Sequence, residues 1–153
     1  MIFTTKAEYG VRLLIQLGLD DSPPTSLKAV AESENLPLAY LERIAALLKR
    51  ADLLTSTRGA HGGYELARPA EDITMDQVVL ALEGAIAPMD CFFDDREGRV
   101  SCSHQGHDHD ACATKVLWTR VQLGVIRSLQ RTTLAELVAF SRSPVLQETM
   151  LNG

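Results

Sequence analysis

Three cysteines could carry chemistry in this chain of 153 residues, namely Cys91, Cys102 and Cys112. Thiolates bind iron–sulfur clusters and zinc, and free thiols undergo redox reactions. An odd number of cysteines gathered in one short segment favours metal or redox chemistry over a framework of disulfides. The gaps of ten and nine residues match neither the paired motifs of a zinc site nor the run of a ferredoxin. The spacing alone therefore leaves cluster ligands, zinc ligands or redox thiols, and structural cysteines as open interpretations.

Histidines and acids lie in the same segment, where His104, His107 and His109 are interspersed with Asp108 and Asp110. Such a group suggests a metallohydrolase, but the chain lacks the further downstream histidines that this kind of site needs. The remaining interpretations are a solvated surface loop, an additional ligand for a cluster or metal, and adventitious metal binding.

The cysteine segment lies between two parts of the chain that have a helical pattern. Residues 85–112 show no regular period, which is typical of a functional or disordered loop. Apolar residues return at helical spacing from Ala113, and a capping box from Thr133 to Glu136 starts a last short helix. The pattern predicts a long helix and a terminal helix over 113–143, followed by a flexible tail over 144–153.

The first 84 residues have the element order of a winged helix-turn-helix domain. Apolar residues predict an amphipathic first helix over 4–19. Ser26 can cap a short second helix that ends at Asn35, and Pro37 suits the first turn of a third helix. These apolar positions are Ala7, Val11, Leu14, Ile15 and Leu19 in the first helix, and Leu41, Ile44, Ala45 and Leu48 in the third.

The period then changes to that of a hairpin. Residues 53–57 and 63–66 read as strands around the glycine-rich tip 58–62, and a capping box predicts a further helix over 74–83. The predicted fold is mainly α, with a winged helix-turn-helix domain over 1–84, a two-stranded wing and a long C-terminal helix.

The second helix of a helix-turn-helix enters the DNA major groove with its N-terminal residues. Tyr40 and Arg43 can donate hydrogen bonds there to phosphates or base edges, and Glu42 can accept one from cytosine or repel phosphate at wrong sites. The same geometry also serves protein–protein contacts, and Tyr40 by itself could equally be a packing residue.

The wing tip supplies the second set of predicted DNA contacts: Arg58, Gly59, His61 and Gly62. A guanidinium on a glycine-rich tip can enter a narrow minor groove, where the negative potential is strongest. The glycines permit a tight turn and a close approach to the DNA backbone.

The net charge of −5 argues against a non-specific nucleic-acid coat, but residues 40–68 are locally basic, with five Lys or Arg against three acids. No apolar run approaches the length of about 18 residues that spans a membrane. The N-terminus lacks the features of a signal peptide, so a cytoplasmic location is expected.

Five stretches resemble the IscR-type family of bacterial winged-helix regulators, which includes IscR, NsrR and RirA. They are TTKAEYG at 4–10, LPLAYLERI at 36–44, LLTSTRGAHGGYEL at 53–66, CATKVLW at 112–118 and TLAEL at 133–137. The resemblance implies a transcription regulator, not an enzyme. It implies a homodimer formed by the long helix, promoter double-stranded DNA as the partner, and DNA contacts by the recognition helix and wing described above.

The resemblance also implies that Cys91, Cys102 and Cys112 bind an iron–sulfur cluster, of 4Fe–4S or 2Fe–2S type. The gaps are longer than is usual in the family, which leaves the cluster type open. A fourth ligand is needed, and Lys115 stands where IscR has a histidine. In NsrR an aspartate of the first helix is the ligand, and Glu8 stands at that place, so Glu8 of the partner subunit is the predicted fourth ligand. The alternatives are a zinc-stabilised or metal-dependent module of the His/Cys loop and a cluster-free thiol redox regulator.

Overall fold

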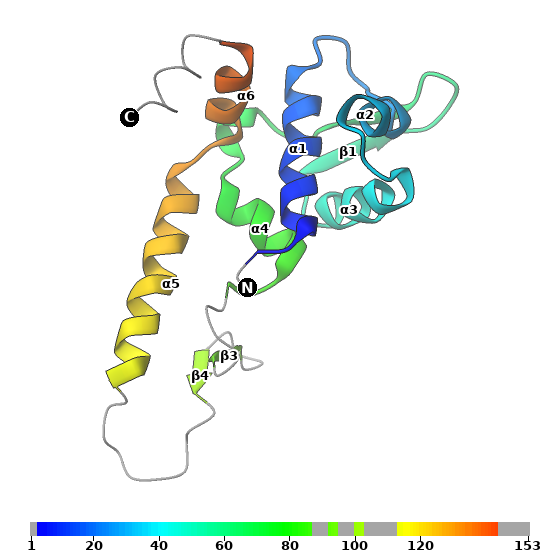
Figure 1. Cartoon of the computed structure of the whole chain (residues 1–153). Coiled ribbons are helices and arrows are strands. Elements are labelled where there is room, and N and C mark those ends of the chain that lie inside the picture. The colour runs from blue at the N-terminus through cyan, green and yellow to red at the C-terminus, as the bar shows by residue number, and fades with distance from the viewer. Residues whose placement is uncertain (1–2, 87–91, 95–99, 103–112, 144–153) are drawn as a thin grey trace.

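The structure is a computed structural model of the chain, and it describes residues 3–86, 92–94, 100–102 and 113–143. Its elements are α1 (Thr5–Leu19), α2 (Leu27–Glu34), α3 (Leu38–Arg50), β1 (Leu54–Thr57), β2 (Gly63–Leu66), the 3-10 turn η1 (Ala70–Asp72), α4 (Met75–Glu83), β3 (Phe92–Asp94), β4 (Val100–Cys102), α5 (Ala113–Arg131) and α6 (Leu134–Arg142). Figure 1 shows the helices α1 to α4 gathered with α6 at one end of the molecule, while α5 extends away from them. The predicted winged helix-turn-helix fold is confirmed.

Local signals place the first three helices as predicted. The Thr4 hydroxyl accepts a hydrogen bond from the Lys6 backbone at the start of α1, and the Ser26 hydroxyl does the same for Lys28 at the start of α2. Asn35 ends α2 in a left-handed conformation with φ of 53°, which asparagine adopts more readily than most residues. Pro37 precedes α3 as its N-cap, so α3 begins one residue later.

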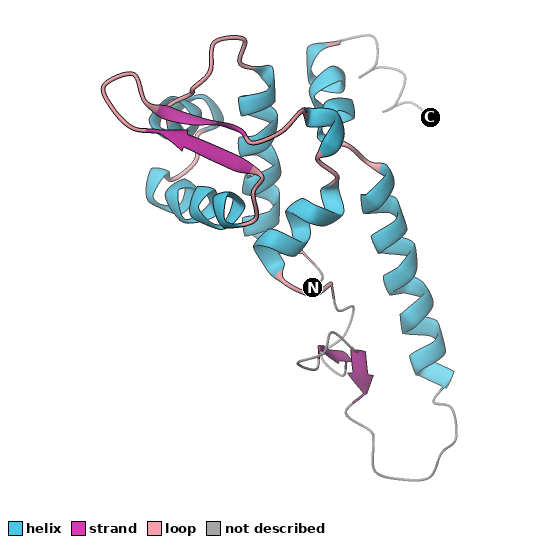
Figure 2. Cartoon of the chain, turned by 180° about the vertical axis from the view of Figure 1, so that it is seen from behind, coloured by secondary structure: helices cyan, strands magenta, loops and turns pink. Residues whose placement is uncertain are grey.

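The wing is an antiparallel pair of strands, seen from behind in Figure 2. Leu54 pairs with Leu66 at its base, and Thr57 pairs with Gly63 beside the tip. Outside the two strands, Thr25 forms an isolated antiparallel bridge with Tyr64. The segment before α2 therefore borders the wing along the edge of β2.

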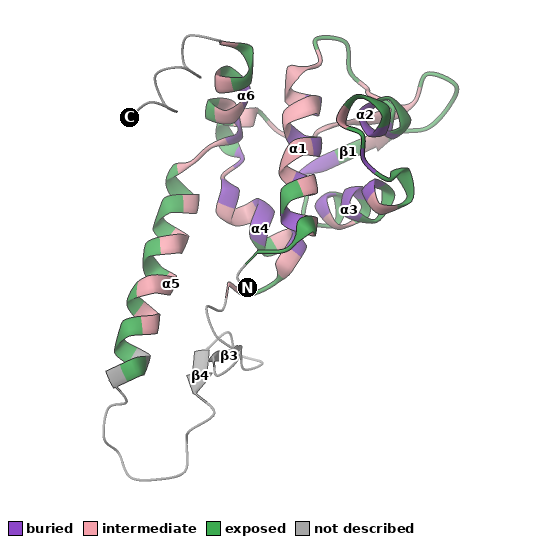
Figure 3. Cartoon of the chain, viewed as in Figure 1, coloured by how far each residue is buried: buried purple, intermediate pink, exposed green. Residues whose placement is uncertain are grey.

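The core lies among α1 to α4 and α6, as the buried residues in Figure 3 show. The four apolar residues predicted for α3 are all buried. In α1 the buried residues are Ala7, Gly10, Leu13, Leu14 and Leu17. Val11, Ile15 and Leu19 of the predicted apolar face are only partly buried. Gly10, Leu13 and Leu17, which lie outside that face, are buried because α1 is contacted by α3, α4, α6 and β2 and is therefore covered on more than one side.

The last helix belongs to this core. Leu134 and Val138 of α6 lie in the same buried cluster as Leu13 and Leu17 of α1. The capping boxes predicted at Thr74 and Thr133 are both present. The two caps also lie side by side, since the Met75 amide donates to the Thr132 carbonyl at 3.0 Å. α6 runs to Arg142, within the range of 113–143 predicted for the last two helices.

The segment between Glu83 and Ala113 was expected to be irregular. Its described residues include the antiparallel pair β3–β4, in which Phe92 pairs with Cys102 and Asp94 with Val100. These three-residue strands are too short for a period to be recognised in the sequence. The predicted tail over 144–153 lies outside the described residues. Within the described part of the chain, no helix combines the length and apolarity that crossing a bilayer requires.

Candidate DNA interface and cysteine segment

The three residues predicted to read the major groove lie in the first two turns of α3. Glu42 and Arg43 are exposed, whereas Tyr40 is half-buried. The hydroxyl end of a half-buried tyrosine can still reach solvent or DNA while its ring is held by packing. The structure therefore brings the predicted residues together at one end of a helix that is anchored by its opposite, apolar face.

Tyr40 is held by the first helix. Its ring meets the ring of Tyr9 edge-to-face, with centroids 5.7 Å apart and an interplanar angle of 85°. The guanidinium carbon of Arg12 lies 5.9 Å from the centroid of the Tyr9 ring, within the range of a cation–π contact. Both interpretations of Tyr40 made from the sequence remain compatible with this position, because packing fixes the ring without covering the whole side chain.

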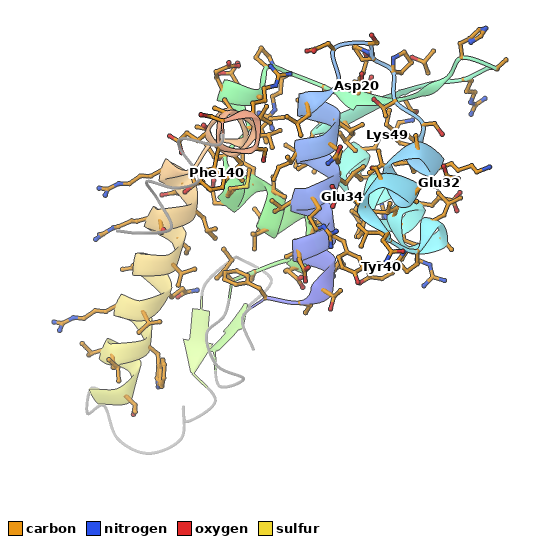
Figure 4. The ribbon with its side chains drawn as sticks, turned by 45° about the horizontal axis from the view of Figure 1, so that its top comes forward. Asp20, Glu32, Glu34, Tyr40, Lys49 and Phe140 are labelled. Carbon is orange, nitrogen blue, oxygen red and sulfur yellow. The ribbon has the colours of Figure 1, made fainter. Side chains whose placement is uncertain are left out.

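Arg12 also holds the turn between α2 and α3. Its Nε lies 2.7 Å from Oε2 of Glu34, and its Nη2 donates to the Glu34 carbonyl oxygen at 2.8 Å. The side-chain amide of Gln16 donates to the other carboxylate oxygen of Glu34 at 2.5 Å. Glu34 is the last residue of α2, so α1 fixes the position of the helix-turn-helix turn (Figure 4).

The wing tip is exposed, and its turn depends on glycine. Arg58, Gly59, Ala60 and His61 are all exposed. Gly59 has a φ of 119°, and the amide of Gly62 donates to its carbonyl at 3.0 Å. A Cβ on Gly62 would lie 2.2 Å from the Thr57 carbonyl oxygen. Glycine is thus required at 59 for the backbone angle and at 62 for space.

A groove of about 430 Å³ lies between the tip end of the wing and the recognition helix. It brings together Glu42 and Gly62, two of the predicted DNA-contacting residues. Its lining also includes Ser26, Lys28 and Tyr64, which the sequence analysis did not select. Ser26 and Lys28 could have been selected from the sequence, because they form the polar start of α2. The position of Tyr64 beside this groove depends on the tertiary structure.

Glu8 lies in the first turn of α1 with 62% of its side chain exposed, and its Oε1 is 3.7 Å from Nη1 of Arg12. Nearby, the carboxylate of Glu83 accepts hydrogen bonds from the amides of Thr4 and Ala7, both at 3.2 Å. Burial opposes ionisation of Glu83, but the hydrogen bonds from Thr4 and Ala7 and the charge of Lys6 outweigh it and lower the pKa of this carboxyl. The end of α4, where the cysteine segment begins, is thereby attached to the start of α1.

Of the predicted cluster ligands, Cys102 ends β4, while Cys91 and Cys112 lie outside the described residues, as do His104, His107 and His109. Phe92, the residue after Cys91 in the chain, pairs with Cys102. Among the residues that the structure describes, no three His, Cys, Asp or Glu residues form a group able to hold a metal ion.

Comparisons with known proteins cover nearly the whole chain. The profile of the Rrf2 family, described as an iron-dependent transcriptional regulator, matches residues 3–140. The chain is 37% identical to the protein rrf2 of Nitratidesulfovibrio vulgaris over 139 residues, which cover 90% of this chain and 87% of that protein.

Two solved structures share the fold. CymR, the global cysteine regulator of B. subtilis, has a TM-score of 0.73 and 32% identity, and the match covers 92% of this chain and 98% of CymR. IscR of T. potens has a TM-score of 0.72 and 31% identity, with coverage of 92% and 88%.

Proposed function

The chain belongs to the Rrf2 family of transcriptional regulators, and we propose that it binds promoter DNA as a homodimer under the control of an iron–sulfur cluster. The family membership makes it a DNA-binding regulator and not an enzyme. The observation that carries the proposed mode of binding is the joint position of the recognition helix and the wing on one groove, with Glu42 on one side and Gly62 on the other.

In the proposed complex, α3 enters the major groove, with Tyr40, Glu42 and Arg43 at the base edges and phosphates. The exposed Arg58 enters the adjacent minor groove from the wing tip, with Gly59, His61 and Gly62 close to the DNA backbone. Gly59 and Gly62 support this assignment. The positive φ of Gly59 and the lack of space for a Cβ at Gly62 allow a tight turn that can approach the DNA backbone closely.

A homodimer formed through α5 is supported by apolar residues that this chain leaves uncovered. The exposed large apolar residues of α5 are Val116, Leu117 and Leu123, and Leu80 of the neighbouring α4 is 59% exposed. Large apolar side chains exposed on two neighbouring helices are typical of a protein–protein interface. A twofold dimer would present two recognition helices, so the DNA site would be a pseudo-palindrome.

The donor set of the cysteine segment fits an iron–sulfur cluster. Thiolates are the usual ligands of such clusters, and the register of β3 with β4 sets Cys102 opposite the residue that follows Cys91. The proposed ligands are Cys91, Cys102 and Cys112, with Glu8 of the partner subunit as the fourth. When bound, the cluster would supply sensitivity to redox, iron or nitric oxide status, because carboxylate is a harder ligand than thiolate and its bond to iron is the labile one.

The exposure of Glu8 supports its assignment, since its carboxylate is accessible to a group outside its own helix. Its ion pair with Arg12 links it to the turn at Glu34 and, through Tyr9, to Tyr40. Withdrawal of the Glu8 carboxylate from Arg12 would therefore act on the contacts that hold the recognition helix. This network is a physical connection between the proposed ligand and the DNA-reading residues.

A solved structure of Staphylococcus aureus CymR, 34% identical to this chain with a TM-score of 0.68, is described as an oxidized form, and this favours a second candidate. In this second candidate, the chain is the same DNA-binding regulator without a cluster, and its cysteines act as redox thiols. A third candidate is a zinc-stabilised or metal-dependent module, in which the cysteines and histidines of the same segment would bind the metal.

Anaerobic purification followed by iron, sulfide and zinc analysis tests these candidates. The proposed function predicts a coloured protein with iron and sulfide in equal amounts. The same preparation is then used to select binding sites from random duplex DNA, and the selected sites should be pseudo-palindromic. A colourless protein that contains no iron would contradict the cluster, while selection of no preferred sequence would contradict the DNA site.

A further inference from the structure

The segment before α2 is hydrogen-bonded to the edge of the wing. A hairpin of two short strands is only marginally stable by itself. At the edge of β2, the Thr25 amide donates to the Tyr64 carbonyl at 2.9 Å, and the Tyr64 amide donates to the Thr25 carbonyl at 2.7 Å. Because Tyr64 is adjacent to Gly63, which pairs with Thr57 just below the tip, this bridge lies close to the element that carries Arg58.

Gly63 permits that bridge. A Cβ at this position would lie 2.4 Å from the carbonyl oxygen of Thr25 and 3.0 Å from its nitrogen. Both atoms belong to the backbone, so a side chain at 63 would have to push the segment away from the wing. The close approach of Thr25 to β2 therefore requires glycine at position 63.

The side chain of Thr25 fixes the same segment to the end of α1. Its hydroxyl donates to Oδ2 of Asp20, and the other carboxylate oxygen of Asp20 accepts a hydrogen bond from the Ser22 amide at 2.8 Å. Asp20 is the C-cap of α1, and its amide donates to the Gln16 carbonyl at 3.2 Å. Figure 4 shows Asp20 at this end of α1, next to the strands. The arrangement of Asp20, Thr25 and Tyr64 is called the wing clasp here.

The loop is also held from the other side of α1. Nη2 of Arg142 in α6 donates to the Leu19 carbonyl at 3.2 Å and to Oδ1 of Asp21 at 3.0 Å. The loop between α1 and α2 is thus contacted by both α6 and the wing. The contacts from Arg142 help to hold the loop residues beside Asp20 in place.

We infer that Asp20 and Thr25 are positioning residues that aim the wing at the minor groove, through the backbone bridge from Thr25 to Tyr64. This inference rests on the proposed function, because it requires the wing to read DNA. Neither residue lines the groove together with the predicted DNA contacts, so their effect on binding must pass through the wing.

The test compares Thr25→Val, which keeps the branched shape and the backbone bridge but loses the hydroxyl, with Thr25→Ser, which keeps the hydroxyl. Thr55→Val is the matched control, because Thr55 lies in the same wing and its hydroxyl is 3.4 Å from Glu65 and away from the clasp. Affinity is measured on a duplex that the unaltered protein selects, together with two footprints. Hydroxyl-radical cleavage reports protection in the minor groove, and dimethyl sulfate reports protection of guanine N7 in the major groove.

Thr25→Val should lower affinity by about tenfold, the scale of one hydrogen bond to a charged group, and should lose the minor-groove footprint while the major-groove footprint remains. Thr25→Ser should restore both, and Thr55→Val should change neither. In an Arg58→Ala background, Thr25→Val should have no further effect. Circular dichroism verifies that each variant is folded.

Full affinity and both footprints in a folded Thr25→Val would overturn the positioning role while leaving wing reading intact, provided that Arg58→Ala weakens binding. Loss of both footprints together would also overturn it, since the clasp would then support the whole domain. An Arg58→Ala variant with unchanged affinity would overturn wing reading, and the clasp inference with it.

Discussion

Nε of Arg12 in α1 lies 2.7 Å from Oε2 of Glu34, the residue that ends α2, and only 18% of the Glu34 side chain is exposed. A partly buried carboxylate needs its hydrogen-bond donors, because removing them leaves a desolvated charge. Glu34 receives donors from both Arg12 and Gln16. The pair therefore sets the turn ahead of the recognition helix.

A matched pair of substitutions measures this contribution. Glu34→Gln should lower the free energy of unfolding by about 1–2 kcal/mol, because it removes a charge-assisted pair. Glu32→Gln, two residues earlier, should change it by less than about 0.5 kcal/mol, because its ion pair with Lys28 spans 3.9 Å and its side chain is 69% exposed. Urea unfolding of both variants gives the comparison, and equal effects would show that Glu34 has no special role.

Arg58→Ala should weaken binding to the selected duplex by about 1–3 kcal/mol at physiological salt, because the guanidinium would leave the minor groove. Arg131→Ala, which removes the same charge from the exposed end of α5, is the control and should bind nearly as tightly as the unaltered protein. Fluorescence anisotropy titrations measure both. An Arg58→Ala variant with unaltered affinity is incompatible with DNA reading by the wing.

Cys91→Ala, Cys102→Ala and Cys112→Ala should each lose or destabilise the visible absorbance and the bound iron, because every proposed cysteine ligand is needed. Helical content should survive, since the buried core is built from apolar residues of α1 to α4 and α6. His104→Ala serves as the control and should keep the chromophore. Any cysteine variant that keeps the full spectrum and iron content is removed from the set of ligands.

Hybrid dimers test whether Glu8 acts across the dimer. A Glu8→Ala chain is paired with a chain that lacks all three cysteines, so one complete site can form only if Glu8 comes from the partner subunit. The hybrid should hold its cluster longer than the Glu8→Ala homodimer does, as followed by the decay of visible absorbance. Equal decay rates would exclude the carboxylate from the partner.

Acid should destabilise the domain through Glu83. Its pKa in the folded protein lies below the ordinary value of 4.5 despite the opposing effect of burial, because Thr4, Ala7 and Lys6 favour the carboxylate. This stabilisation is complete above the unfolded pKa and is lost as the pH falls through the folded one. Glu83→Gln should therefore show a flatter fall in the free energy of unfolding between about pH 5 and pH 3.

Asp20 has a pKa lowered by its hydrogen bonds with Thr25 and Ser22, so some acid sensitivity should remain in the Glu83→Gln variant. Thermal or urea unfolding across this pH range measures both contributions. An identical pH profile for the variant and the unaltered protein would contradict the role of Glu83.

Short-range signals in the sequence predicted most of the architecture. The caps at Ser26, Thr74 and Thr133 and the glycine-rich tip before β2 act within a few residues, so their effects can be read from neighbouring positions. The recognition helix and the wing followed from the same local rules. The residue types in the cysteine segment likewise limited its possible roles, without a structure, to cluster binding, zinc binding or redox thiols, and structural cysteines.

Contacts between distant segments were decided by the tertiary structure alone. Nothing in the spacing of the sequence pairs Arg12 with Glu34, Tyr9 with Tyr40, or Thr25 with Tyr64, because such partners meet only when α1, the turn and the wing pack together. The buried Gly10, Leu13 and Leu17 of α1 were missed for the same reason, since a periodic pattern describes one face of a helix whereas α1 is contacted on several. The sequence by itself thus determined the helices and the wing, though not the short pair β3–β4, and it determined which residues are chemically able to read DNA or bind a cluster. Their mutual support, from α1 to the recognition helix and from the wing clasp to the wing, depends on packing geometry that no local pattern contains.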